Sequence, residues 1–147
     1  MRNFFKSKPP TVELSLLQLG GDGYCAVVGE SHYQAALRET AGMCSIGQEG
    51  ERMFQAFLVR EPSNPHDSNA IAVYSSQGQL GYLSRENAEV YLDVLEEVAE
   101  RGYDGGACDA ILRGGTPGKP SYGVVLRLAD PDSCFADLVG EAEGDPD

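Results

Sequence analysis

The sequence predicts a small α+β domain, mostly β, in which about six short strands close into a barrel beside one long helix. Short runs of apolar and β-forming residues recur along the chain, each bounded by glycine, proline or polar turns. One longer segment instead repeats apolar residues at helical spacing. Strands this short would leave exposed edges in an open sheet, and closure into a barrel removes them. The 147 residues fit a single domain, because domains commonly hold roughly 100–200 residues.

The strand pattern sets the order of the elements. Residues 52–59 are apolar on both faces, which predicts a central strand. The segment 75–78, Ser-Ser-Gln-Gly, joins two strands and predicts a hairpin. Residues 11–19 fit both periods and are left open between strand and short helix, whereas Gly20-Gly-Asp-Gly23 predicts a turn, since glycine reaches positive φ without a Cβ clash. The predicted strands are residues 24–28, 52–59, 70–74, 79–83, 107–112 and 122–128.

Two helices are expected, and residues 135–139 predict a further turn of helix. A short helix is predicted over residues 33–40, with the Ser31 side chain as its N-terminal cap. The long helix begins after Ser84 and runs from Arg85 to about Arg101, where Gly102 ends it. Its apolar residues recur on one face, which predicts that this face covers the core. They are Ala88, Tyr91, Leu95 and Val98.

Charge divides the chain more sharply than its total suggests. The 23 acidic and 11 basic residues give a net charge of −12, which argues against nonspecific binding to nucleic acid or anionic membranes. Six acids lie in residues 86–100 and seven follow Arg127, with no base in either segment. The remainder carries 10 acids and 11 bases, so a local positive site is compatible with the sequence. We expect residues 1–23 to form an arm and lead-in, residues 24–128 the domain, and residues 129–147 an acidic tail.

Several protein classes are excluded. No apolar run approaches the ~18 residues of a membrane span, and the basic first ten residues lack the apolar core of a secretory signal. The four cysteines lie far apart, which predicts neither a disulfide framework nor a zinc site. We therefore expect a cytoplasmic protein with reduced thiols, no membrane partner, no metal and no cofactor.

The segment from Leu58 to Leu83 carries the most informative motif. It reads Leu58-Val-Arg-Glu-Pro62, then Asn64-Pro65, then Asp67-Ser-Asn-Ala-Ile-Ala-Val73. Val27-Val-Gly29 and His32-Tyr33 precede this motif, and Gly81-Tyr-Leu83 and Ala88 follow it. The stretch resembles the HIRAN domain, a module found before the ATPase motor of helicase-like transcription factor proteins and alone in bacteria. The resemblance covers residues 24–128. It implies an OB-like barrel of about six strands that recognises single-stranded DNA ends through the 3′-hydroxyl.

The resemblance also implies a binding site, residue by residue. Asp67 stands at the family's aspartate position, where a carboxylate would accept a hydrogen bond from the terminal 3′-hydroxyl. His66 stands where the family has a tyrosine that stacks on a base, and its smaller ring should stack more weakly. His32 and Tyr33 occupy the place of the family's aromatic pair. Purely structural roles stay open as alternatives: a turn from Asp67 towards Asn69, an exposed loop position for His66 and a core position for Tyr33.

The other residues of the implied site would lie near the phosphates of the bound DNA strand. Arg85 matches a basic family position at the start of the long helix and would contact a phosphate, aided by the N–H groups of the helix N-terminus. The alternative for Arg85 is an ion pair with Glu89. Asn64 and Tyr82 would line the same edge. Two departures weaken the match, since Ser31 replaces a basic residue and Glu86 adds a negative charge beside Arg85. We therefore expect weak or salt-sensitive binding.

The resemblance thus predicts a non-catalytic module that recognises single-stranded DNA 3′ ends in DNA repair or replication-fork processing, with a separate helicase or nuclease chain as partner. The alternative is a protein-interaction adaptor or DNA mimic that has kept the barrel and lost DNA binding, which the acidic tail favours. The chain has no GxxxxGK[ST] phosphate loop and no HExxH or recognisable Ser-His-Asp arrangement, so no enzyme is expected. Asp67 and His66 alone are too few ligands for a metal.

Overall fold

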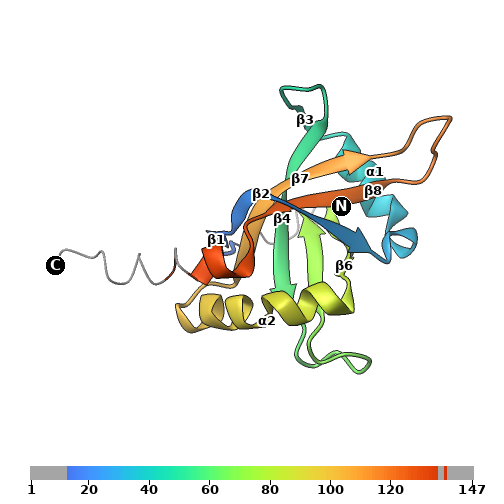
Figure 1. Cartoon of the computed structure of the whole chain (residues 1–147). Coiled ribbons are helices and arrows are strands. Elements are labelled where there is room, and N and C mark those ends of the chain that lie inside the picture. Colours follow the sequence, from blue (N-terminus) through green and yellow to red (C-terminus); the bar gives the residue numbers. More distant parts are fainter. Residues whose placement is uncertain (1–12, 136–137, 139–147) are drawn as a thin grey trace, which may run out of the picture.

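The computed structural model describes residues 13–135 and 138 (Figure 1). Residues 1–12 of the expected arm, and most of the expected tail, lie outside the described residues. The elements, in chain order, are β1 (Leu16–Gln18), β2 (Gly20–Val28), the 3-10 turn η2 (Glu30–His32), α1 (Gln34–Ala41), β3 (Ser45–Ile46), β4 (Arg52–Arg60), β5 (Ile71–Ser75), β6 (Gly78–Leu83), α2 (Arg85–Glu100), β7 (Gly105–Arg113) and β8 (Gly123–Leu128). Residues 131–135 are also helical.

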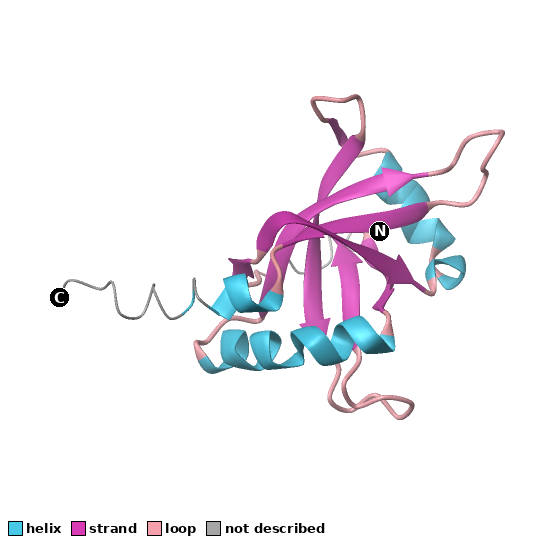
Figure 2. Cartoon of the chain, in the orientation of Figure 1, coloured by secondary structure: helices cyan, strands magenta, loops and turns pink. Residues whose placement is uncertain are grey.

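Six strands form the closed antiparallel barrel that the sequence predicts (Figure 2). Around the barrel the order is β7, β8, β2, β6, β5 and β4, and β4 pairs back onto β7. β4 lies between β5 and β7, which confirms that residues 52–59 form a central strand. The short strands β1 and β3 add to the rims, β1 parallel to β7 and β3 antiparallel to β4. The expected mostly-β, OB-like barrel is therefore confirmed.

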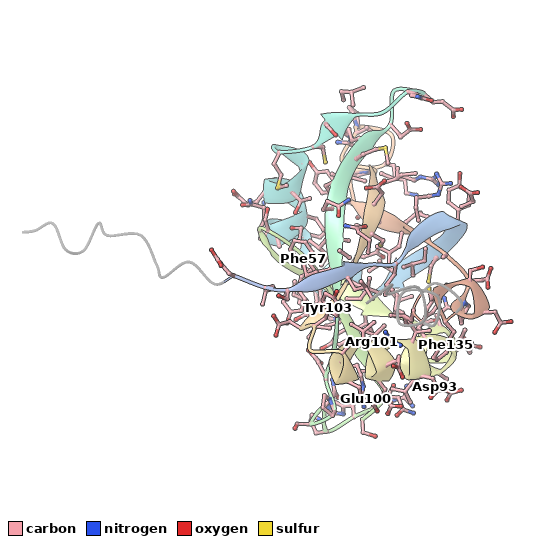
Figure 3. All side chains as sticks on the ribbon, turned by 90° about the vertical axis from the view of Figure 1, so that its left-hand side faces the viewer. Phe57, Asp93, Glu100, Arg101, Tyr103 and Phe135 are labelled. Atoms are coloured by element: carbon pink, nitrogen blue, oxygen red, sulfur yellow. The ribbon has the colours of Figure 1, made fainter. Side chains whose placement is uncertain are left out.

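α2 packs its apolar face onto the barrel and begins where the sequence places it. The Ser84 hydroxyl accepts a hydrogen bond from the Asn87 N–H at 3.1 Å and so caps the helix. The Tyr91 hydroxyl donates to the Ala129 carbonyl oxygen at 2.7 Å, which joins the helix to the segment after β8. The acidic residues lie on the other side: Asp93 and Glu100 are exposed along the lower edge of Figure 3. The buried residues of α2 are Ala88, Tyr91, Val94, Leu95 and Val98.

The predicted turn at Gly20–Gly23 is wrong, because these residues belong to β2. The strand is irregular there, and both Gly20 and Gly23 pair with Leu128. Neither Gly21 nor Gly23 has positive φ. A Cβ on Gly23 would instead lie 2.7 Å from the Leu128 carbonyl oxygen, and one on Gly21 2.6 Å from Cα of Ala129. These glycines permit close approach to β8 rather than a reversal of the chain.

The short helix is confirmed as α1, but the expected cap is wrong. Ser31 lies in η2, and no side chain caps the first turn of α1. Gln34 fixes the helix start instead, because its Nε2 donates to the carbonyl oxygens of Glu30 and Tyr122, each at 3.1 Å. The segment left open at 11–19 contains strand β1.

The expected tail helix begins earlier than predicted, since residues 131–135 and 138 are helical, while residues 136, 137 and 139 lie outside the described ones. Within the described ranges, no helix is both long and apolar enough to cross a membrane.

Candidate nucleic-acid interface

The loop between β4 and β5 is irregular, as its two prolines predict, yet hydrogen bonds close it on itself. The Glu61 N–H donates to the Ala70 carbonyl oxygen at 2.9 Å, which joins the two ends of the loop. Inside it, the Asn64 N–H donates to the Glu61 carbonyl oxygen at 2.9 Å and the Ala70 N–H to that of Asp67 at 3.0 Å. The loop side chains therefore extend from a backbone that is held by hydrogen bonds.

Asn64 holds the backbone of two later residues of this loop. Its Oδ1 accepts hydrogen bonds from the His66 N–H at 2.8 Å and from the Asp67 N–H at 3.1 Å. Its Nδ2 donates to Oε1 of Glu61 at 2.9 Å. Asn64 thus uses both ends of its amide to hold the loop, and it also lines the hollow described below.

The Asp67 carboxylate makes the turn that the sequence leaves open. Its Oδ1 accepts a hydrogen bond from the Asn69 N–H at 2.9 Å. The side chain is half-buried, and no described residue donates to its second oxygen, Oδ2. A carboxylate has about four lone-pair sites, so the turn leaves acceptor capacity for a ligand.

Five of the seven predicted residues line one hollow of about 290 Å³. It lies on the outer side of the barrel, where the end of β2 meets β6 and the start of α2. We call it the Asp67 hollow. A larger hollow of about 510 Å³, beside Leu14, Phe57 and Tyr74, is lined by no charged side chain. The residues that line the Asp67 hollow are Val28, Asn64, His66, Asp67, Ala70, Tyr82, Leu83 and Arg85.

Arg85 spans the gap between α2 and the loop. Its guanidinium donates to the His66 carbonyl oxygen at 3.2 Å. No carboxylate in the described part of the chain forms an ion pair with it, so the alternative pairing with Glu89 does not occur. The Arg85 side chain is exposed, and the remaining N–H groups of its guanidinium are available to an anionic ligand. The His66 side chain is also exposed.

The aromatic pair His32 and Tyr33 does not line the Asp67 hollow. The two rings meet edge to face, with centroids 6.4 Å apart and an interplanar angle of 80°. His32 is exposed and Tyr33 is half-buried. Burial raises the pKa of Tyr33, and the neighbouring Tyr82 and Glu61 raise it further. Tyr33 therefore lies near Tyr82, which lines the hollow.

Two residues of this region were missed from the sequence. Val28 is 42% exposed at the end of β2 and forms part of the apolar wall. Glu61 accepts hydrogen bonds from Tyr82 and Asn64, each at 2.9 Å. Glu61 lies inside the Leu58–Pro62 motif, and this position in the motif was the sequence feature that could have identified it as a residue of the site.

A small closed barrel carries a polar loop beside the start of a helix, and the hollow between them is lined by one acidic and one basic side chain. The sequence profile of the HIRAN domain matches residues 21–99, more than half of the chain, and the chain belongs to the HIRAN domain family. That family is known as a nucleic-acid-binding, non-catalytic module. Comparison with curated protein sequences gives no match.

Two solved structures are similar to this chain. The HIRAN domain of human HLTF shares 19% identity with a TM-score of 0.45, covering 79% of this chain and 82% of that one. A protein from Lactobacillus plantarum shares 25% identity with a TM-score of 0.44, covering 75% of this chain and 94% of that one.

Proposed function

We propose that this chain is a non-catalytic module that captures single-stranded DNA ends by their 3′-hydroxyl. The observation that carries the proposal is that Asp67 and Arg85, 18 positions apart in the sequence, line one hollow. Asp67 offers a carboxylate oxygen to a hydroxyl donor, and Arg85 offers a cation to the adjoining phosphate. The separate carboxylate and guanidinium match the two chemical groups of a 3′-terminal nucleotide.

The other predicted residues take supporting roles in this proposal. His66 is exposed at the rim, where its ring can stack on the terminal base. His32 and Tyr33 are proposed to contact the next nucleotide along the flank, beyond Tyr82. Asn64 holds the loop, as its hydrogen bonds indicate. We extend the proposal to a cytoplasmic role in DNA repair or replication-fork processing, with a separate helicase or nuclease chain as partner.

Fluorescence anisotropy with a short single-stranded DNA tests the proposal. The strand carries either a 3′-hydroxyl or a 3′-phosphate, and each is titrated at several salt concentrations. We expect the hydroxyl end to bind more tightly, because the Asp67 carboxylate repels a terminal phosphate. D67N should weaken binding of the hydroxyl end about tenfold, as expected for loss of a hydrogen bond to a charged group.

R85Q should act differently from D67N. Removing one phosphate contact should reduce the slope of log affinity against log salt by about 0.7 and leave the preference for the hydroxyl end in place. R101Q is the matched control, because Arg101 lies at the other end of α2 in an ion pair with Glu97. No binding of either strand at low salt would contradict the proposal and leave the protein-interaction adaptor as the explanation of the retained barrel.

A further inference from the structure

Glu61 is the first residue after β4, and its side chain joins two elements that are distant in sequence. Oε1 accepts a hydrogen bond from the Tyr82 hydroxyl at 2.9 Å and another from Nδ2 of Asn64 at 2.9 Å. Tyr82 belongs to β6 and Asn64 to the loop. A single carboxylate oxygen therefore ties the loop to the barrel wall.

The backbone of Glu61 holds the same loop. Its N–H donates to the Ala70 carbonyl oxygen and its carbonyl oxygen accepts from the Asn64 N–H, each at 2.9 Å. Asn64 in turn fixes the amide of Asp67 at 3.1 Å. The position of the Asp67 carboxylate thus depends on Glu61 through Asn64.

Glu61 also lies next to the aromatic flank of the hollow. Burial raises the pKa of both Tyr33 and Tyr74, and the negative charge of Glu61 raises each pKa further. Tyr33 and Tyr74 therefore lie near this carboxylate, and Tyr82 is the tyrosine that donates a hydrogen bond to it. Glu61 consequently adjoins both parts of the proposed interface, the Asp67 loop and the segment that carries Tyr33.

We propose that Glu61 is the positioning residue of the Asp67 hollow, holding the loop against Tyr82 so that the Asp67 carboxylate is in place before a ligand arrives. The inference rests on the proposed function. A site whose groups are already ordered loses less conformational entropy on binding, so its affinity is higher.

Amide hydrogen exchange of the whole chain, measured without nucleic acid, tests the positioning directly. E61M keeps the bulk of the side chain and removes the acceptor, so we expect exchange at Asp67, Asn69 and Ala70 to rise about tenfold. E61Q retains an oxygen that accepts both hydrogen bonds, and it should stay within about threefold of the wild type. E39M is the matched control, because Glu39 is exposed on α1.

Y82F deletes only the hydroxyl that donates to Glu61, and Y74F is its control. We expect Y82F to speed exchange in the loop and Y74F to leave it unchanged. The same variants are then titrated with the 3′-hydroxyl strand. E61M should bind about tenfold more weakly, and E61Q should bind like the wild type.

Three results would overturn the inference. The first is loop exchange unchanged in E61M, and the second is E61Q behaving like E61M. The third is exchange that rises equally across the barrel strands, which would show a role in stability alone. If the wild type binds no strand, the proposed function fails, whereas the exchange data still decide whether Glu61 positions the loop.

Discussion

Gly81 lies in the middle of β6, where one added methyl group should disturb the wall of the Asp67 hollow. Its φ is +155°, a conformation that side-chain-bearing residues rarely adopt. A Cβ there would lie 2.5 Å from the Val28 carbonyl oxygen and 2.6 Å from Cγ1 of Val27. Both residues belong to β2, which pairs with β6 through Val27 and Val28. Because the nearer contact is to backbone, the strands must move apart to accept a side chain.

The expected cost of G81A has two parts. The strained φ costs about 1–3 kcal/mol. Forcing atoms into a tightly packed contact costs a further 1–3 kcal/mol or so, by the range known for overpacking. We therefore expect G81A to lower the free energy of unfolding by about 3 kcal/mol, which for a domain of this size lowers Tm by roughly 6–12 °C. Circular dichroism during thermal and urea unfolding measures both quantities.

Substitutions at two other glycines separate the cost of backbone strain from the cost of a steric clash. Gly50 has a φ of +83° and no atom within 4 Å of an added Cβ, so G50A should cost only about 1 kcal/mol. Gly118 has neither a positive φ nor a neighbour within 4 Å, and G118A should be nearly neutral. If G81A is no less stable than G50A, the close approach of β2 and β6 does not exist and the reasoning is refuted.

Two further substitutions test local features of the fold. S84A removes the acceptor for the Asn87 N–H and should cost about 1 kcal/mol in urea unfolding, and an unchanged midpoint would show that the cap is not formed. For Glu30, burial raises the pKa above its ordinary 4.5, although the Val124 N–H that it accepts lowers it. The folded protein thus holds this proton more tightly than the unfolded chain, and stability is lost as pH rises through this range. The glutamine of E30Q cannot ionise. The free energy of unfolding of E30Q minus that of the wild type should therefore be larger at pH 7 than at pH 4, and an equal difference at both pH values would contradict this.

The features that the sequence predicts correctly are local ones. The Ser84 cap and its N–H donor lie three residues apart, so the long helix can be placed from one segment. Apolar residues on both faces of residues 52–59 mark β4 as central without knowledge of its partners. The prolines at 62 and 65 likewise exclude regular structure by their own geometry.

The features that sequence reasoning missed depend on partners far along the chain. Gly23 lies against Leu128, and the strand Leu128 belongs to cannot be identified from Gly23 and its neighbours. Glu61 meets Tyr82 21 positions away, across the β5–β6 hairpin. Ser31 resembles a helix cap by its position, but no side chain caps α1; Gln34 instead anchors the helix start to the backbone of Tyr122, just before β8. In each case a tertiary contact overrides a local preference.

The acidic charge is less opposed to the proposed function than its total suggests. α2 has 16 residues and spans about 24 Å, so Glu100 lies well beyond the roughly 8 Å over which charges act at physiological salt. Arg85 stands at the opposite end, beside the Asp67 hollow. A DNA strand lying across the acidic face of α2 would be repelled along its length, whereas an end entering the hollow would meet the Arg85 guanidinium and the Asp67 carboxylate, with Glu86 next to Arg85 in the sequence. In the proposed function, the acidic face of α2 would therefore disfavour binding within a strand and leave the terminal group to decide what is bound.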